Sequence, residues 1–187
     1  MGRPLVARGV ILNPKKQMKI LSIDASCERL LITCAGAYKT YHGGRATPYI
    51  LPLVNELLTE LNLELADLDG FSAVVGPGSF TGVRVGVSTI NAFCLSTGKK
   101  AVAVTSLELA GENAYLPAGN DNYYIKTGER YYFDSTAPAN HTQFSPEYPP
   151  QMLEQVAQEK FSKGQETSIL TPFYMRKSQA ERMADGD

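Results

Sequence analysis

Buried strands and one-sided helices alternate along the chain between residues 19 and 108. Apolar runs bounded by turn residues predict strands, and apolar residues spaced three and four apart predict helices. The expected strands are 20–24, 30–34, 37–42, 71–75 and 101–104, and the expected helices are 47–61, 81–97 and a short one that opens at 105–108. Three strands followed by alternating helices and strands indicate an α/β layer.

The chain changes character after residue 115. Segments 123–126 and 130–133 flank a Thr-Gly-Glu turn, which predicts a hairpin. The proline-rich residues 135–150 predict a loop, and 151–163 predict a helix. The tyrosines of the hairpin could pack a small sheet or stack on nucleic-acid bases, and the acidic isoelectric point favours packing.

Three parts are expected along the chain: a leader at 1–17, a first lobe at 18–115 and a reduced second lobe with a tail at 116–187. Prolines and basic residues interrupt the leader, so it does not have the continuous apolar core of a secretory signal. We expect a leader that is disordered or that was added or mistranslated ahead of a natural start at Met18. A natural disordered arm is the alternative.

Composition excludes several classes of function. The 187 residues carry a net charge of −1, and the isoelectric point is near 6.1, so the basic field of an independent nucleic-acid binder is missing. No segment approaches the roughly 18 consecutive apolar residues of a membrane helix. Cys27, Cys34 and Cys94 lack metal-binding spacing and indicate a reducing, cytoplasmic setting. His42 and His141 are isolated, so neither a hydrolase triad nor a metal centre can be assembled.

The segment 76–82 reads Gly-Pro-Gly-Ser-Phe-Thr-Gly and links an expected strand to an expected helix. Backbone N–H groups at such a helix start can bind phosphate, and a carboxylate at the end of the first strand can hold Mg²⁺ beside it. The candidate anion or nucleotide contacts are therefore Asp24, Gly78, Ser79 and Thr81. The segment matches neither the dinucleotide fingerprint nor the P-loop. A turn or cap role for Asp24 is the alternative.

Gly82 and Gly86 both lie inside the expected helix 81–97 and share one face of it. Each glycine costs about 1 kcal/mol relative to alanine in a helix interior, so the pair needs a physical reason. Close approach of another backbone supplies one. Helix faces of small residues pack closely both within a chain and between chains, so the residues alone leave both possibilities open.

Five blocks of residues resemble the TsaB family, which is also called YeaZ. They are 19–26, 50–58, 76–86, 105–108 and the tail at 172–182. The resemblance implies an α/β, actin-like fold (ASKHA, ribonuclease H-like) with two lobes, of which the second is shortened here. It also implies a part in forming threonylcarbamoyladenosine in tRNA.

The same resemblance implies which partners the chain has. In that system TsaD carries the metal and transfers the threonylcarbamoyl group, TsaE hydrolyses ATP, and TsaB is the non-catalytic subunit that binds TsaD. Members of the family form homodimers when alone. For this chain we expect TsaD as the primary partner, TsaE and tRNA only through the complex, and no membrane. No cofactor is expected to be required, and weak nucleotide binding is expected mainly in the complex.

The family's contact with TsaD comes from the two helices that correspond to 47–61 and 81–97. The interface residues expected here are Ile50, Val54, Leu57, Gly82, Arg84, Gly86, Val87 and Ile90. This favours an intermolecular explanation of the glycine pair. No catalytic residue and no metal ligand is expected.

The chain also departs from the family in two places. The histidine that usually precedes the first of these helices is absent from 45–48, which strengthens the non-enzyme interpretation. The strand that should follow Glu108 is not recognisable at 116–121. The alternative function is a nucleotide-dependent phosphotransferase that uses Asp24 and the glycine loop. A peptidase is disfavoured because no pair of nucleophile and base can be assembled.

Overall fold

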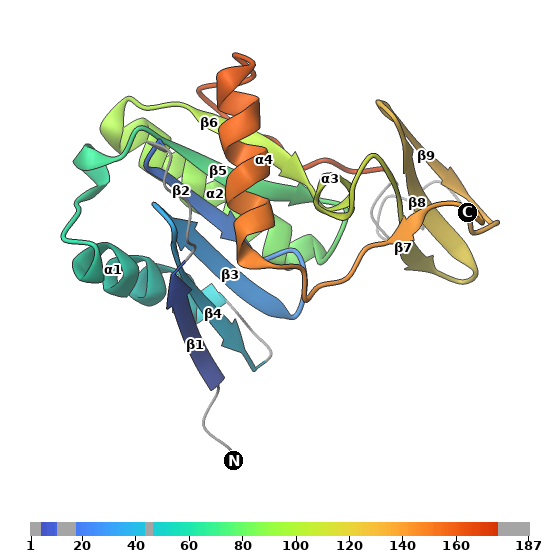
Figure 1. Ribbon diagram of the computed structural model, residues 1–187, viewed down its shortest axis with the longest axis horizontal. Helices are drawn as coiled ribbons and strands as arrows, with labels where there is room; N and C mark the ends of the chain where they lie inside the picture. Colours follow the sequence, from blue (N-terminus) through green and yellow to red (C-terminus); the bar gives the residue numbers. More distant parts are fainter. Residues whose placement is uncertain (1–4, 11–17, 44–46, 176–187) are drawn as a thin grey trace, which may run out of the picture.

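The structure is a computed structural model that describes residues 5–10, 18–43 and 47–175. Its larger sheet has six strands in the order β1-β4-β3-β2-β5-β6 (Figure 1). The strands are β1 (Leu5–Val10), β2 (Ile20–Asp24), β3 (Arg29–Cys34), β4 (Ala37–His42), β5 (Gly70–Gly76) and β6 (Ala101–Thr105). β2, β5 and β6 run parallel, and the β1-β4-β3-β2 pairs are antiparallel.

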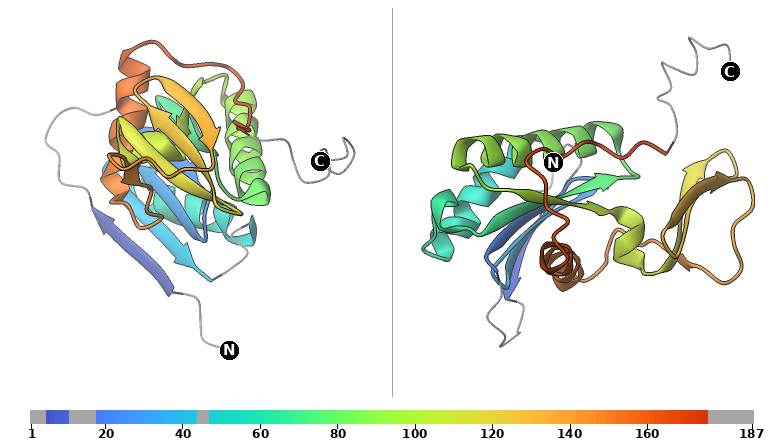
Figure 2. Two further views of the ribbon diagram at one scale, coloured as in Figure 1. Left: turned by 90° about the vertical axis from the view of Figure 1, so that its right-hand side faces the viewer. Right: turned by 90° about the horizontal axis from the view of Figure 1, so that it is seen from above.

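Helices cover both faces of this sheet (Figure 2). α1 (Ile50–Glu60) and α2 (Phe80–Thr97) lie on one face, and α4 (Pro150–Ser162) lies on the other. Every residue of β2, β3 and β5 is therefore buried. Within the described part of the chain, no helix combines the length and the apolar character needed to span a bilayer.

The expected strands and helices of the first 110 residues are confirmed, with one correction at a helix start. α1 starts later than the expected residue 47, because residues Thr47–Tyr49 form a separate 3-10 turn and α1 begins after Tyr49 with no side-chain cap. The short helix α3 (Ser106–Ala110) starts with a reciprocal capping box between Thr105 and Glu108. A second 3-10 turn, η2 (Leu65–Asp67), precedes β5.

A smaller sheet of four strands follows in the order β10-β7-β8-β9. Its strands are β7 (Asn113–Gly119), β8 (Asn122–Thr127), β9 (Arg130–Asp134) and β10 (Thr142–Gln143). The predicted hairpin is β8–β9. β7 occupies the region where no strand was recognisable, because Pro117 and Gly119 mask its pattern and shift its register against β8.

The last third of the chain divides between the two sheets, which differs from the expected boundary at 115/116. β7 to β10 form the smaller sheet, but α4 returns to the larger one, where Leu153 and Ala157 are fully buried. Thr167 then forms a bridge with Ala101, and the N–H of Phe173 donates to the carbonyl of Val75 at 2.8 Å. The segment 167–175 therefore lies along the first lobe.

Part of the expected leader is ordered in the structure. Leu5–Val10 is strand β1, which pairs antiparallel with β4 from Leu5↔His42 to Val10↔Ala37. The expectation of a disordered leader is therefore corrected for these six residues. The remaining leader residues, 1–4 and 11–17, lie outside the described residues.

A buried lysine connects the sheet to α1. Lys39 of β4 has only 1% of its side chain exposed, and its Nζ donates to Glu56 at 2.8 Å and to Glu60 at 2.7 Å. Lys39→Met keeps the apolar stem but removes both charge-assisted hydrogen bonds. Because the two carboxylates are partly exposed and return to water, we expect a loss of about 1–2 kcal/mol in the free energy of unfolding, measured by urea denaturation at neutral pH.

The same contact sets a pH dependence. Burial alone would lower the pKa of Lys39, but the hydrogen bonds and charges of Glu56 and Glu60 outweigh it and raise this pKa. A raised pKa adds stability below the unfolded-state pKa, and this stability is lost as the pH rises through the folded-state pKa. The difference in the free energy of unfolding between wild type and Lys39→Met should therefore become smaller above about pH 10.4. A difference that stays constant to high pH would contradict this origin.

Candidate functional site

The glycine loop after β5 is closed against the turn that follows β2. The N–H of Ser79 donates to the carbonyl of Ser26 at 2.6 Å. A Cβ on Gly78 would lie 2.4 Å from the same oxygen. Ser79 is the N-cap of α2, and its Oγ accepts from the N–H of Gly82 at 3.3 Å. Gly78 therefore allows the loop to pack on its own chain, and the hydroxyl of Ser79 caps the start of α2.

The glycine pair of α2 also faces the same chain. A Cβ on Gly82 would lie 1.8 Å from the carbonyl oxygen of Ala25, and this distance is too short for any side chain. Gly86 is buried, and a Cβ there would make ordinary contacts of 3.7 Å with Ala25 and Ile23. The intermolecular explanation of the pair is therefore corrected: close approach to the end of β2 explains Gly82.

Asp24 lies at the end of β2 and is fully buried. One carboxylate oxygen accepts from the N–H of Ser26 at 2.8 Å, and the other accepts from the hydroxyl of Tyr148 at 2.7 Å. Burial first, and then the charge of Asp24, raises the pKa of Tyr148 well above its usual value, so this hydroxyl stays protonated and donates. The carboxylate is thus enclosed by a tyrosine from the segment before α4.

Arg29 holds Tyr148 in this position. Its Nη1 donates to the carbonyl of Tyr148 at 2.9 Å, and its guanidinium lies 4.5 Å from the centre of the tyrosine ring. Arg29 is itself only 4% exposed. The structure brings the Asp24 turn next to the loop of Gly78 and Ser79, as an anion site would require, but it covers the carboxylate from the other side.

The remaining candidate groups offer little chemistry. Thr81 is exposed on the first turn of α2. Burial, followed by the charge of Asp24, raises the pKa of Cys27 to about 12, so its thiol is a poor nucleophile at neutral pH. Within 18–43 and 47–175, no three His, Cys, Asp or Glu side chains gather as a metal site would require. Anion binding by this loop stays a prediction.

Most of the residues expected at a partner interface lie in the core instead. They are no more than 4% exposed and face the larger sheet: Ile50, Val54, Leu57, Val87 and Ile90. Gly86 is also buried, and only Arg84 of the expected set is exposed. The apolar stripe of these helices faces the core of the chain itself. Residues available to a partner therefore lie on the opposite side of each helix.

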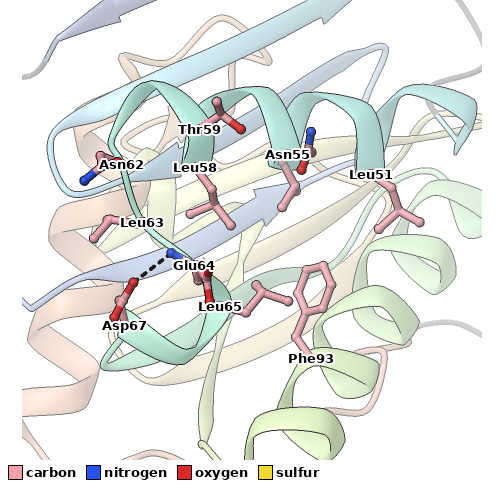
Figure 3. Close-up of a pocket in the computed structure, with 11 residues that line it drawn as sticks. Leu51, Asn55, Leu58, Thr59, Asn62, Leu63, Glu64, Leu65, Asp67 and Phe93 are labelled. Carbon is pink, nitrogen blue, oxygen red and sulfur yellow. Dashed lines mark hydrogen bonds between the residues drawn. The ribbon is translucent and has the colours of Figure 1, made fainter.

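The outward surface of the two helices is here called the α1–α2 face. It consists of Leu51, Asn55 and Thr59 from α1 and of Arg84, Val85, Ser88, Ala92, Phe93 and Leu95 from α2. A hollow of about 810 Å³ lies between α1, η2 and Phe93, whose ring points toward α1 (Figure 3). Leu51 and Phe93 line both this hollow and a neighbouring one of about 500 Å³ over Arg84.

The α2 part of this face is nearly uncharged. Among its 18 residues α2 carries one charged side chain, Arg84. The two exposed leucines of the face, Leu51 and Leu95, are 58% and 88% exposed. Charged residues normally dominate the solvent side of a surface helix, so the scarcity of charge on α2 and the exposed leucines distinguish this face from an ordinary helix surface.

The tyrosines of the smaller sheet mostly contact other aromatic rings. Tyr115 meets Tyr123 edge to face with ring centres 5.8 Å apart, and Tyr124 lies 5.6 Å from Phe133. Tyr131 contacts Phe173 of the tail at 5.1 Å, and its hydroxyl lies 3.2 Å from that of Thr105. These contacts agree with the packing interpretation and join the smaller sheet to the first lobe.

Comparisons with known proteins bear on both the fold and this face. A family model described as "TsaD: tRNA N6-adenosine threonylcarbamoyltransferase" matches residues 47–125. The proteins named "tRNA threonylcarbamoyladenosine biosynthesis protein TsaB" of Escherichia coli and Bacillus subtilis are 29% and 34% identical over 107 and 102 residues. These matches cover 54% and 51% of this chain and 46% and 44% of the relatives. These relatives support assignment of the chain to the TsaB (YeaZ) family.

A solved structure, YeaZ from Pseudomonas aeruginosa, supports the same fold. It matches with a TM-score of 0.71 and 17% sequence identity, over 84% of this chain and 99% of that chain. The chain thus has an actin-like fold, with the smaller sheet as its second lobe. It spans less than half the length of the two curated relatives.

The two glycines of α2 provide a matched test of this packing. Gly82→Ala should lower the free energy of unfolding by about 3 kcal/mol, because its Cβ would collide with the carbonyl of Ala25. Gly86→Ala has room and should be neutral, or stabilising by up to about 1 kcal/mol through helix propensity. Thermal and urea denaturation measure both variants. Equal effects of the two substitutions would show that the close approach to Ala25 is not the constraint.

Proposed function

We propose that this chain is a non-catalytic accessory subunit in the formation of threonylcarbamoyladenosine in tRNA, and that it binds and activates a TsaD-type threonylcarbamoyltransferase through the α1–α2 face. The observation that carries the proposal is the nearly uncharged outward side of α2, together with the exposed Leu51 of α1, in a chain that is similar to TsaB proteins. Partner interfaces are depleted of charge at their centre and enriched in apolar side chains, and this face has both properties.

The assembly follows from this role. TsaD is the primary partner, TsaE and tRNA are reached through the complex, and the isolated chain forms a homodimer, as the family resemblance implies. The net charge of −1 supports delegation of tRNA binding to partners, because a protein that binds phosphates by itself needs a basic surface. A role in tRNA modification supports a cytoplasmic location.

The enclosed carboxylate supports a role without catalysis. Asp24 is the residue that a nucleotide-dependent phosphotransferase would use to position Mg²⁺, and Tyr148 covers it with a hydrogen bond of 2.7 Å. In the glycine loop, the N–H of Ser79 likewise donates to the carbonyl of Ser26. A nucleotide that used Asp24 through Mg²⁺ and the N–H of Ser79 would have to displace both contacts.

An apolar contact at Leu51 tests the proposed interface. Leu51→Asp places a charge in the centre of the α1–α2 face and should weaken binding to the TsaD of the same organism about tenfold or more, because the charge would be desolvated in the complex. Affinity is measured by isothermal titration with purified TsaD. The leucine is 58% exposed, so the fold should persist, and circular dichroism checks this.

Two control variants sharpen this measurement. Leu51→Met keeps an apolar side chain and should bind as the wild type does. Tyr132→Asp introduces the same charge at a residue of the smaller sheet that is 40% exposed and should also leave binding unchanged. Wild-type affinity for Leu51→Asp, or no binding by the wild type, would rule out docking through this face.

A calorimetric titration with ATP and Mg²⁺ discriminates the alternative, a nucleotide-dependent phosphotransferase. The isolated chain should show no micromolar binding, because Asp24 is enclosed and the loop is closed on Ser26. Micromolar binding that Asp24→Asn removes would favour the phosphotransferase over the accessory role.

A further inference from the structure

Arg84 is the only charged residue of α2, and it lies at the edge of the hollow next to Leu51. Its guanidinium is fixed by two aromatic rings. The guanidinium carbon lies 3.8 Å from the centre of the Phe80 ring, one helical turn earlier, and 5.8 Å from that of Tyr174. The Nε–H donates to the hydroxyl of Tyr174 at 2.8 Å. Stacking and this hydrogen bond together restrict the rotamers of a side chain that is otherwise among the most flexible.

The tail positions Tyr174. The side chain of Asn91 exchanges two hydrogen bonds with the backbone of Leu170, at 2.8 and 2.9 Å. Leu170 is 3% exposed, and the N–H of Phe173 is bonded to the carbonyl of Val75. The Tyr174 ring then stacks on Phe80 with ring centres 5.4 Å apart. The tail therefore places the tyrosine beside Arg84 through contacts of its own.

The terminal nitrogens of Arg84 are left for another group. Its Nε is used, and none of the ion pairs found between described residues involves Arg84. A guanidinium held by its Nε and its flat faces presents Nη1 and Nη2 as a fork that matches the two oxygens of a carboxylate. On a face that is otherwise uncharged, one such pair fixes the register of a partner.

Four acidic groups that the structure describes near this face are already engaged. Glu56 and Glu60 of α1 bind Lys39. Glu64 and Asp67, at the far end of the hollow, form the reciprocal capping box of η2. A second copy that docked through the same face would present these four carboxylates with partners already in place, and this favours a different protein as the source of the carboxylate.

We propose that Arg84, positioned by Tyr174 and Phe80, receives a carboxylate from a helix of the TsaD-type partner and sets the register of the complex. This rests on the proposed function and adds the chemistry of the partner's contact to it. Arg84 is the specificity-determining residue of the α1–α2 face. Tyr174 is a positioning residue that acts through Arg84.

The test uses the full chain and the TsaD of the same organism, with affinity measured by isothermal titration at two salt concentrations. Arg84→Ala should weaken binding about tenfold or more. Arg84→Lys should weaken binding nearly as much, because an ammonium group cannot form the two-pronged contact with a carboxylate. The loss should be larger at low salt. Arg130→Ala, at an exposed arginine of the smaller sheet, is the matched control and should bind as the wild type does.

A double-mutant cycle tests the role of Tyr174. Tyr174→Phe keeps the ring that stacks on Phe80 but removes the hydroxyl that accepts from Arg84. Binding should weaken several-fold, and the penalty for Arg84→Lys should become smaller in this background, because the fork is no longer aligned. A purely structural role for Tyr174 would leave the arginine-to-lysine penalty unchanged and would overturn the positioning assignment.

The outcomes separate this inference from the proposed function. If the wild type binds TsaD and Leu51→Asp abolishes binding while Arg84→Ala and Arg84→Lys bind normally, the carboxylate contact is overturned and the interface stands. If the wild type does not bind TsaD, the proposed function fails first. If Arg84→Glu dissolves only a dimer of this chain and leaves TsaD binding intact, the contact belongs between two copies and the proposal is overturned. Rescue of Arg84→Glu by a glutamate-to-lysine change on a TsaD helix would support it directly.

Discussion

The arrangement of the first lobe depends on one close contact, where the backbone of Gly82 lies against the carbonyl of Ala25. The absence of a Cβ at this position lets the first turn of α2 touch the turn that follows β2. That contact draws the glycine loop onto Ser26 and places Asp24 where Tyr148 can cover it. It also fixes which side of α2 points outward. The glycine loop, which resembles a phosphate-binding loop in sequence, thus serves to position α2 against the sheet.

Two aromatic contacts then hold the smaller sheet to this lobe. Tyr148 lies on the segment between β10 and α4 and is fastened by Asp24 and Arg29. Phe173 bonds to the end of β5 and contacts Tyr131 of β9. Because both contacts lie at the edge of the sheet where the parallel strands end, the position of the second lobe is set by side chains of this chain. In open α/β sheets, ligands commonly bind outside this edge.

The sequence reveals the elements of the first lobe because its periodicities are strong and its caps are local, as at Thr105 and Glu108. β7 escapes detection because Pro117 and Gly119 interrupt its pattern. Most of the interface residues expected on α1 and α2 lie in the core, as Val54 and Ile90 do, whereas Arg84 of the same set is exposed. Spacing alone shows that one side of a helix is apolar, but not whether that side meets its own core or another protein. The enclosure of Asp24 by Tyr148 joins residues 124 positions apart and leaves no local signal.

The pairing of β1 with β4 has a consequence for handling the protein. β4 would present an open row of backbone donors and acceptors if β1 were removed, and such rows recruit strands from other molecules. A variant trimmed to begin at Met18 would therefore have β4 in place of β1 as the edge strand, while the core around Leu30 and Ile32 would be unchanged. The six residues of β1 thus decide which backbone groups the edge of the sheet presents to other molecules.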